Sequence, residues 1–352
     1  MELRKRSMIC ALCCALLAVT GCGSEEDSEA PAGQETVLDI NWPSDTENET
    51  AAAQPDANTQ LKLKVGQRFP LRKIVSQTLT QFGSEQQAQS QSRLELMLEV
   101  RVDDVQATRT KMQVRYLAVL YSQSINGQTT FYDSRAAQQE IPPAALMYQG
   151  LVNNGFSFWI GADHQIGELE GFDEFLGRCV NAIPETQRQD AIAILAAQVG
   201  ESKIANFIDD SIGLLPESGD PQVGQKWQKT RHVLQPLPIQ LDMNCSLDRV
   251  NSEDLEISVV GRIRPNVSQS LNHQTNPGLR LTVEKGHSLG SCRISRASGL
   301  PIQSQQKMEL DFLVHIPNGG QIRQHKQIIT EISTYEQNSA PIQLNKPAAA
   351  AH

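Results

Sequence analysis

The fold of this chain is decided by one stretch near its carboxyl end, MELDFLVHI (308–316), PNGG (317–320) and QIRQHKQIITEIS (321–333). Every second residue of the first segment is apolar, which is typical of a β-strand with one buried face and one face in water. The PNGG segment is a strong turn signal. We therefore expect the segments on either side of it to form an antiparallel hairpin.

Two earlier segments show the same alternation, Leu94–Val102 and Leu241–Leu247. Each is followed by a polar turn and a second run of β-type residues, Met112–Tyr121 in one case and Leu255–Ile263 in the other. The pattern predicts two β-rich halves, one in each part of the chain.

The two halves also share a weak internal repeat. VGQRF (65–69) returns as VGQKW (223–227), and VDDV (102–105) returns as LDRV (247–250). The repeat indicates either a duplicated unit or two sheets built under similar constraints, and the residues leave both explanations open.

Between the halves the apolar spacing changes from two residues to the three and four that are typical of helices. The apolar positions fall into three groups, which are Phe172, Phe175, Leu176, Cys179 and Val180; Ile192, Leu195 and Val199; and Ile204, Phe207, Ile208 and Ile212. The predicted fold class is therefore α+β, mainly antiparallel β, with two curved sheets or half-barrels and a three-helix insertion between them.

The amino terminus resembles a bacterial lipoprotein signal. RKR (4–6) precedes an apolar run, Met8–Val19, of 12 residues, whereas a membrane-spanning helix needs about 20. The run ends in VTGC (19–22), which fits the lipobox pattern. The resemblance implies cleavage between Gly21 and Cys22 and attachment of acyl chains to Cys22. We expect a membrane anchor without a membrane span.

Residue 23 bears on the destination of the anchored protein. Lipoproteins kept at the inner membrane commonly carry Asp directly after the lipidated cysteine, and this chain carries Gly23. The resemblance therefore implies an outer-membrane lipoprotein that faces the periplasm.

Charge is spread very unevenly along the chain. The formal net charge is -9, and residues 23–60 alone contribute -10 because they hold ten acids and no Lys or Arg. Residues 61–352 are nearly neutral, which excludes the basic footprint of a nucleic-acid-binding protein. The acidic segment is expected to be disordered. The predicted segments are a signal peptide (1–21), an acidic tether (22–60), a first β half (61–168), a helical insertion (169–215), a second β half (216–335) and a disordered tail (336–352).

Four cysteines remain in the predicted mature chain. Cys22 is the lipidation residue, and Cys179 lies on an apolar helical stripe, where we expect a buried thiol. Cys245 and Cys292 both fall on predicted strands, in a compartment that permits disulfides. Cys245 and Cys292 could form a disulfide, or both could stay reduced. The sequence leaves both possibilities open, since cysteine pairing cannot be deduced from sequence alone.

One motif has the form of a catalytic site. GHSLG (286–290) fits the Gly-x-Ser-x-Gly pattern, in which the serine sits on a strained turn between a strand and a helix. The residues after it read as another strand rather than a helix, so its glycines are better explained by a bend or by close strand packing. Asp311 and His325 could meet across the predicted hairpin. A serine esterase at Ser288 stays as an alternative, and the preferred prediction is that the chain is not an enzyme.

The histidines do not group into a metal site. His164, His232, His273 and His352 have no second ligand at metal-binding spacing. The sequence also contains no phosphate loop, zinc ribbon or calcium loop. We predict no metal and no cofactor.

The order of several landmarks resembles an uncharacterised family of bacterial, chiefly planctomycete, envelope proteins, the domain-of-unknown-function family 6263. The landmarks lie at 65–69, 131–134, 156–167, 216–227 and 286–301. Together they run over nearly all of residues 61–335. The family has no assigned activity, so the resemblance implies only location and architecture.

These observations predict a lipid-anchored cell-envelope lipoprotein of unknown molecular activity. Its expected partners are the membrane, through acylated Cys22, and an apolar ligand or lipid held on the concave face of the sheets. The alternative is a structural or scaffolding module that binds another envelope protein. We expect no nucleic-acid partner.

Overall fold

The computed structural model describes residues 61–82, 88–136, 141–142, 145–161, 166–181, 183–185, 188, 192, 214–215, 222–233, 239–265, 280–315 and 320–335. The predicted signal peptide, the tether and the tail lie outside these residues, as do Gly21 and Cys22. The boundaries drawn there from the sequence stay predictions.

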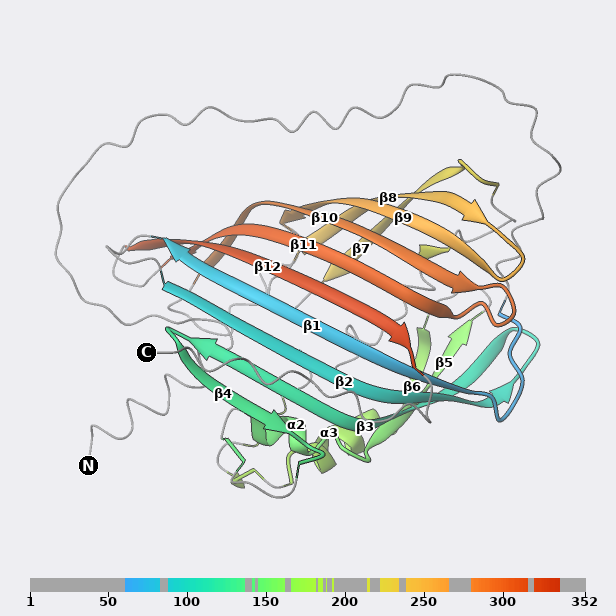
Figure 1. Cartoon of the computed structure of the whole chain (residues 1–352), viewed down its shortest axis with the longest axis horizontal. Coiled ribbons are helices and arrows are strands. Elements are labelled where there is room, and N and C mark those ends of the chain that lie inside the picture. The colour runs from blue at the N-terminus through green and yellow to red at the C-terminus, as the bar shows by residue number, and fades with distance from the viewer. Residues whose placement is uncertain are drawn as a thin grey trace. The chain divides into compact units, whose positions relative to one another are not determined.

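The described part of the chain forms one antiparallel sheet of twelve strands, accompanied by two short helices (Figure 1). The strands are β1 (Arg68–Phe82), β2 (Ala88–Val105), β3 (Arg109–Ile125), β4 (Gln128–Asp133), β5 (Gly155–Gly161), β6 (Ile166–Glu170), β7 (Lys226–Val233), β8 (Ile239–Val250), β9 (Asp254–Pro265), β10 (Arg280–Ser295), β11 (Pro301–His315) and β12 (Gln321–Thr334). The helices are α2 (Leu146–Gln149) and α3 (Phe172–Cys179). Across the sheet the order is β6-β5-β3-β2-β1-β12-β11-β10-β9-β8-β7, and β4 also pairs with β3.

The strands predicted from alternation are confirmed. β11 and β12 form the expected hairpin, in which Asp311 lies opposite His325. The two earlier alternating segments lie in β2 and β8, and the runs that follow them lie in β3 and β9. Alternation was a sound guide because successive side chains of a strand point to opposite faces of the sheet.

The prediction of two separate sheets is wrong. β1 pairs with β12 in antiparallel register from Leu71 opposite Thr334 to Phe82 opposite Arg323. This pairing joins the first half of the chain to its carboxyl end, so the two halves continue into each other as one curled sheet (Figure 1). The fold is mainly antiparallel β.

The internal repeat corresponds to a shared local structure. Gly66 and Gly224 both have a positive φ, 85° and 83°, which favours glycine. The Gly66 amide donates to the Val102 carbonyl at 2.8 Å, and the Gly224 amide donates to the Leu247 carbonyl at 2.7 Å. Both halves therefore begin with the same turn, attached to the same point of the second strand.

The repeat continues into the next hairpin of each half. The pairing of β2 with β3 shifts register between Val102 and Asp104, and the pairing of β8 with β9 shifts between Leu247 and Arg249. These positions correspond in the two copies of the repeat, so each half carries the same β-bulge directly after its second strand contacts the glycine turn. The similarity that was weak in sequence is thus clear in the backbone.

The predicted three-helix insertion is not borne out. Of the three helices expected in 169–215, only α3 is found among the described residues, and the other two lie largely outside them. The second described helix, α2, is four residues long and precedes this segment. Phe175, Leu176 and Cys179 of α3 are buried, as its apolar stripe predicted.

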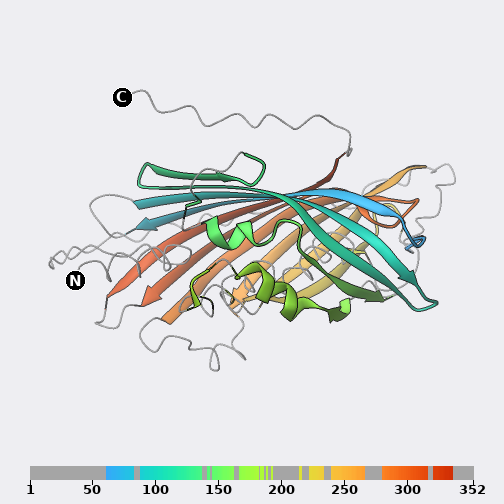
Figure 2. The same ribbon diagram turned by 90° about the horizontal axis from the view of Figure 1, so that it is seen from below.

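The two faces of the sheet differ in what covers them. Figure 2 shows α2 and α3 against one face, which we call the inner face; the opposite one is the outer face. On the inner face the Phe175 ring packs 5.8 Å from the Tyr116 ring of β3 and 5.1 Å from the Phe156 ring of β5. Within the described residues, no helix is long and apolar enough to cross a membrane.

Candidate functional site

The inner face carries an apolar patch across the four central strands β2, β1, β12 and β11. Its residues are Leu94, Val75, Leu79, Ile328 and Met308, and all of them are only partly buried. The registers place Val75 opposite Leu94 and Met308 opposite Ile328, on the same face. Gln77 of β1 lies between Val75 and Leu79 on this face, opposite Ile328. We call this set the inner patch.

Elsewhere on the inner face apolar side chains are fully buried. Leu247 of β8, Ile257 of β9 and Val314 of β11 are each 0% exposed. The inner face therefore combines a closed apolar core with a more open stretch over the central strands. Burial of apolar surface of this kind is what stabilises an open sheet.

The charged side chains that face inward on the described strands are all cations. Register places four cations of the described strands on the inner face, Lys73, Lys229, Arg231 and Lys326. Every Asp and Glu of the described strands lies on the outer face, at a strand end or at a bulge. The inner face is thus positive where it is charged. Each of these four cations already takes part in an interaction within the chain.

Two of these cations occupy the same place in the repeat. Lys73 lies opposite Leu96 on β2, and Arg231 lies opposite Leu241 on β8. Both follow the glycine turn of their own half by the same number of residues. Arg231 is only 9% exposed. An inward cation on the first strand is therefore a feature of both halves.

Buried amide and hydroxyl groups also line the inner face. Gln306 is 6% exposed and its Nε2 donates to Ser288 Oγ at 3.1 Å, while its Oε1 has no hydrogen-bond partner. Gln324 is 0% exposed, and neither its Oε1 nor its Nε2 has a partner. Buried polar groups are nearly always paired, so Gln324 is an exception that needs an explanation.

The outer face is a lattice of cross-strand ion pairs. They include Arg72 with Glu95 (2.8 Å), Arg68 with Glu99 (3.2 Å), Arg323 with Glu284 (3.0 Å) and Lys285 with Asp311 (3.6 Å). Charged side chains at this density are suited to contact with water. Ligand binding is therefore better sought on the inner face.

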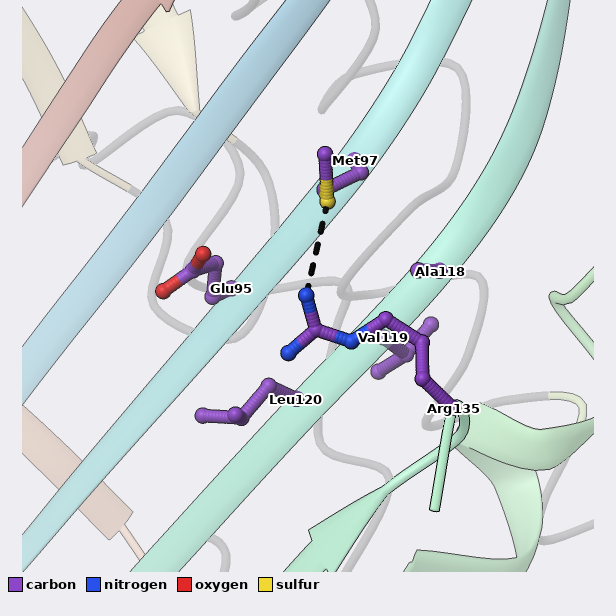
Figure 3. A pocket seen from close by; sticks show the side chains of 6 residues that line it. All are labelled: Glu95, Met97, Ala118, Val119, Leu120 and Arg135. Atoms are coloured by element: carbon purple, nitrogen blue, oxygen red, sulfur yellow. Dashed lines mark hydrogen bonds between the residues drawn. The ribbon is translucent and has the colours of Figure 1, made fainter. Parts of the chain in front are cut away.

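A depression on the outer face lies between β2, β3 and Arg135 (Figure 3). Arg135 reaches over β3 toward Met97 and Glu95, and its guanidinium donates to both carboxylate oxygens of Asp133 at 2.9 Å. Partial burial alone would raise the pKa of Asp133, but the hydrogen bonds and charge of Arg135 outweigh it and lower that pKa. The depression is packed too tightly to admit water, so it is a structural contact.

The GHSLG motif does not form a nucleophile elbow. It lies inside the continuous strand β10, and Ser288 is 0% exposed on the inner face. A Cβ at Gly286 would lie 2.9 Å from the Glu309 carbonyl oxygen, and one at Gly290 would lie 2.9 Å from that of Gln305. The glycines permit close packing of β10 on β11, as the sequence pattern indicated.

The acid and base expected for such a site lie elsewhere. His325 Nδ1 is 2.7 Å from Asp311 Oδ1, so the cross-hairpin contact is confirmed. Asp311 and His325 point to the outer face. Ser288 points to the inner face, because it lies opposite Met308, which is three residues from Asp311 on a strand whose successive side chains alternate between faces. The structure therefore brings together two of the three residues of the esterase alternative and separates the third.

The disulfide considered between Cys245 and Cys292 is absent. Neither cysteine is in a disulfide, and both are buried, on β8 and β10. Strand β9 runs between them, with Val259 opposite Cys245 and Ile257 opposite Cys292. Two strand spacings amount to about 9.6 Å, which exceeds the roughly 7 Å that a disulfide can span between Cα atoms.

The three described thiols are expected to be inert in the folded protein. Burial raises the pKa of Cys179 to about 12 and that of Cys245 to about 11, and the thiolate is the reactive form. We expect iodoacetamide at pH 8 to leave Cys179, Cys245 and Cys292 unmodified in native protein and to modify all three in urea, as read by peptide mass mapping. Labelling of native Cys245, or a Cys245–Cys292 peptide, would contradict the structure.

The predictions on histidine and on lipidation fall largely outside the part of the chain that the structure describes. No group of three or more His, Cys, Asp or Glu suited to a metal occurs in the described residues. His164 and His273 lie outside those residues. Cys22 also lies outside them, so its lipidation stays a prediction.

Sequence reasoning missed the polar residues of the inner face. Extending the apolar alternation of β11 backward from Met308 reaches Gln306. On β12 the same face holds Gln324 opposite Phe312 and Lys326 opposite Leu310. A polar residue at an apolar position of an alternating strand was the signal that could have found them.

Comparisons with known proteins add a family. Residues 107–301 match the model of a family of unknown function, DUF6263, as the sequence resemblance implied. No curated protein matches the chain.

Two solved structures show distant likenesses to this chain. OpdL from Pseudomonas aeruginosa is 7% identical with a TM-score of 0.20, over 76% of this chain and 99% of that chain. A putative outer membrane lipoprotein-sorting protein domain from Vibrio parahaemolyticus is 8% identical with a TM-score of 0.13, over 77% and 87%. Likenesses this distant support no argument.

Proposed function

This chain belongs to the DUF6263 family of unknown function, and we propose that it is a lipid-anchored envelope protein that holds an apolar ligand, a lipid, on the inner face of its sheet. The anchor is Cys22, and the expected location is the outer membrane, facing the periplasm. The protein acts by binding, without catalysis.

The observation that carries the proposal is the inner patch. Five apolar side chains on four adjacent strands are only partly buried, on the face around which the sheet curls. Apolar surface gathered on one concave face is typical of ligand sites rather than of scattered surface residues. On the outer face the exposed apolar side chains stand among charged groups, as Leu289 does beside Lys307, which pairs with Glu309.

The anchor fits such a role. Acyl chains on Cys22 would keep the protein at a lipid surface, and the acidic segment that follows would let the sheet reach away from it. A binding protein held near the membrane has a high local concentration of lipid available to it.

Native mass spectrometry of gently purified full-length protein tests the proposal. We expect a co-purifying lipid, which Ile328→Gln should largely remove because it places an amide in the inner patch. Ile329→Gln is the matched control, since Ile329 is the next residue of β12 and points to the outer face. Repeated recovery of wild-type protein without any bound small molecule would overturn the proposal, and recovery with a protein partner instead would favour the scaffolding alternative.

A further inference from the structure

Gln324 is the least explained polar group of the inner face. Its side chain is 0% exposed, and all of its hydrogen-bonding capacity is unused. Leaving a buried donor or acceptor unpaired destabilises the folded state. Leucine at this position would avoid that cost, so a role for the amide has to offset it.

The neighbours of Gln324 are a mixture of apolar and polar side chains. Phe312 of β11 lies opposite it on one side and Gln81 of β1 on the other. Two residues further along β12, Lys326 lies between Leu310 and Leu79, and Leu79 belongs to the inner patch. The unpaired amide and a cation thus stand at one end of the half-exposed apolar surface.

The charge of the surroundings limits what could pair with this amide. The described strands place no carboxylate on the inner face, and the cation nearest along the strand is Lys326. Amide N–H groups and an ammonium group donate hydrogen bonds, and together they favour an acceptor that carries negative charge. The apolar side chains beside them favour an aliphatic chain.

We propose that Gln324 and Lys326 form the head-group end of the ligand site, and that the ligand is an amphipathic anion with a long aliphatic chain. The head group accepts from Gln324 Nε2 and lies near the Lys326 ammonium, and the chain runs along Leu79, Ile328 and Val75. From Lys326 to Thr330, at the far end of the patch, β12 rises about 13 Å. This inference rests on the proposed function and adds the chemical class of the ligand.

Equilibrium binding of three radiolabelled probes to the full chain tests the inference. The probes are oleate, 1-oleoyl lysophosphatidate and oleyl alcohol, and Cys22→Ala is used throughout so that detergent can be omitted. We expect at least one of the two anions to bind about tenfold more tightly than the alcohol, the effect of one charge-assisted hydrogen bond. Tighter binding of oleate identifies a fatty acid, and tighter binding of lysophosphatidate identifies a phospholipid.

Two variants locate the head group. Lys326→Met should remove most of the preference for anions, whereas Lys307→Met should keep it because Lys307 lies on β11 and points to the outer face. Gln324→Leu should weaken binding of the preferred anion several-fold and raise the melting temperature of the free protein, since it removes an unpaired buried amide. A purely structural glutamine would give a lower melting temperature instead.

The outcomes separate this inference from the proposed function. Equal binding of all three probes, or a preference that survives Lys326→Met, would overturn the anionic head group while leaving an apolar ligand in place. Failure of every probe to bind would overturn both. Loss of the anion preference in Lys326→Met alone, with the alcohol still bound, is the expected result.

Discussion

Gly155→Ala is expected to lower the free energy of unfolding by about 3 kcal/mol or more, the upper range for forcing extra volume into a packed interior. Gly155 begins β5 and pairs with Arg115 of β3. A Cβ there would overlap the Val114 carbonyl oxygen. Because the obstacle is backbone rather than a flexible side chain, β5 and β3 would have to separate.

Separating β5 from β3 would be costly because an aromatic cluster packs directly beside Gly155. Phe156, the next residue, is 3% exposed and packs against Phe175 of α3. Phe175 in turn stacks on Tyr116 of β3. A shift of β5 would therefore loosen the only aromatic cluster that the described residues place between the sheet and α3.

Two other glycines of the same region serve as controls. A Cβ at Gly167 of β6 or at Gly177 of α3 would meet nothing within 4 Å. Gly167→Ala should be nearly neutral, and Gly177→Ala should stabilise the protein by about 0.5–1 kcal/mol because alanine is the better helix residue. Urea midpoints measure all three variants. A Gly155→Ala midpoint close to that of Gly167→Ala would show that β5 does not approach β3 so closely.

Local pattern predicted the local elements well. The alternation in Met308–Ile316 and the turn after it were sufficient for the β11–β12 hairpin, because the two strands follow each other directly in the chain. The apolar spacing around Phe175 and Cys179 likewise predicted α3 and its buried thiol. In each case the residue pattern lies in the same segment as the element that it predicts.

Long-range pairing could not be predicted in this way. β1 and β12 come from opposite ends of the described chain, and nothing in 68–82 points to 321–334 as its neighbour. The prediction of two sheets failed for this reason. The internal repeat predicted part of the structure, since its glycine turns and bulges are equivalent in the two halves. It carries no information on how the two halves pair with each other.

The candidate site could be predicted from the sequence only in part. Single-strand patterns place Gln306 and Gln324 on an apolar face, but only the sheet register shows that Lys326 stands next to Leu79 of β1. A site assembled from several strands depends on their order and register, which a sequence pattern within one strand does not contain.

Cys22→Ala is expected to abolish acylation, an all-or-none effect, and with it the lipid anchor. Cys22 ends the VTGC lipobox after the export signal, and its thiol is the atom to which the lipid would be joined. Each buried methylene contributes about 0.8 kcal/mol, so two or three chains hold a protein stably where a single chain exchanges. Alanine has no atom that can carry the first of them.

Labelling cells with radioactive palmitate and fractionating their membranes measures both effects. In wild type we expect labelled protein in the outer-membrane fraction; in Cys22→Ala we expect unlabelled protein that is either released into the periplasm or left unprocessed. Cys14→Ala is the matched control, because Cys14 lies in the apolar run without the small residues of a lipobox before it. Continued labelling of Cys22→Ala would overturn the anchor, and with it the argument that the inner patch works beside a lipid surface.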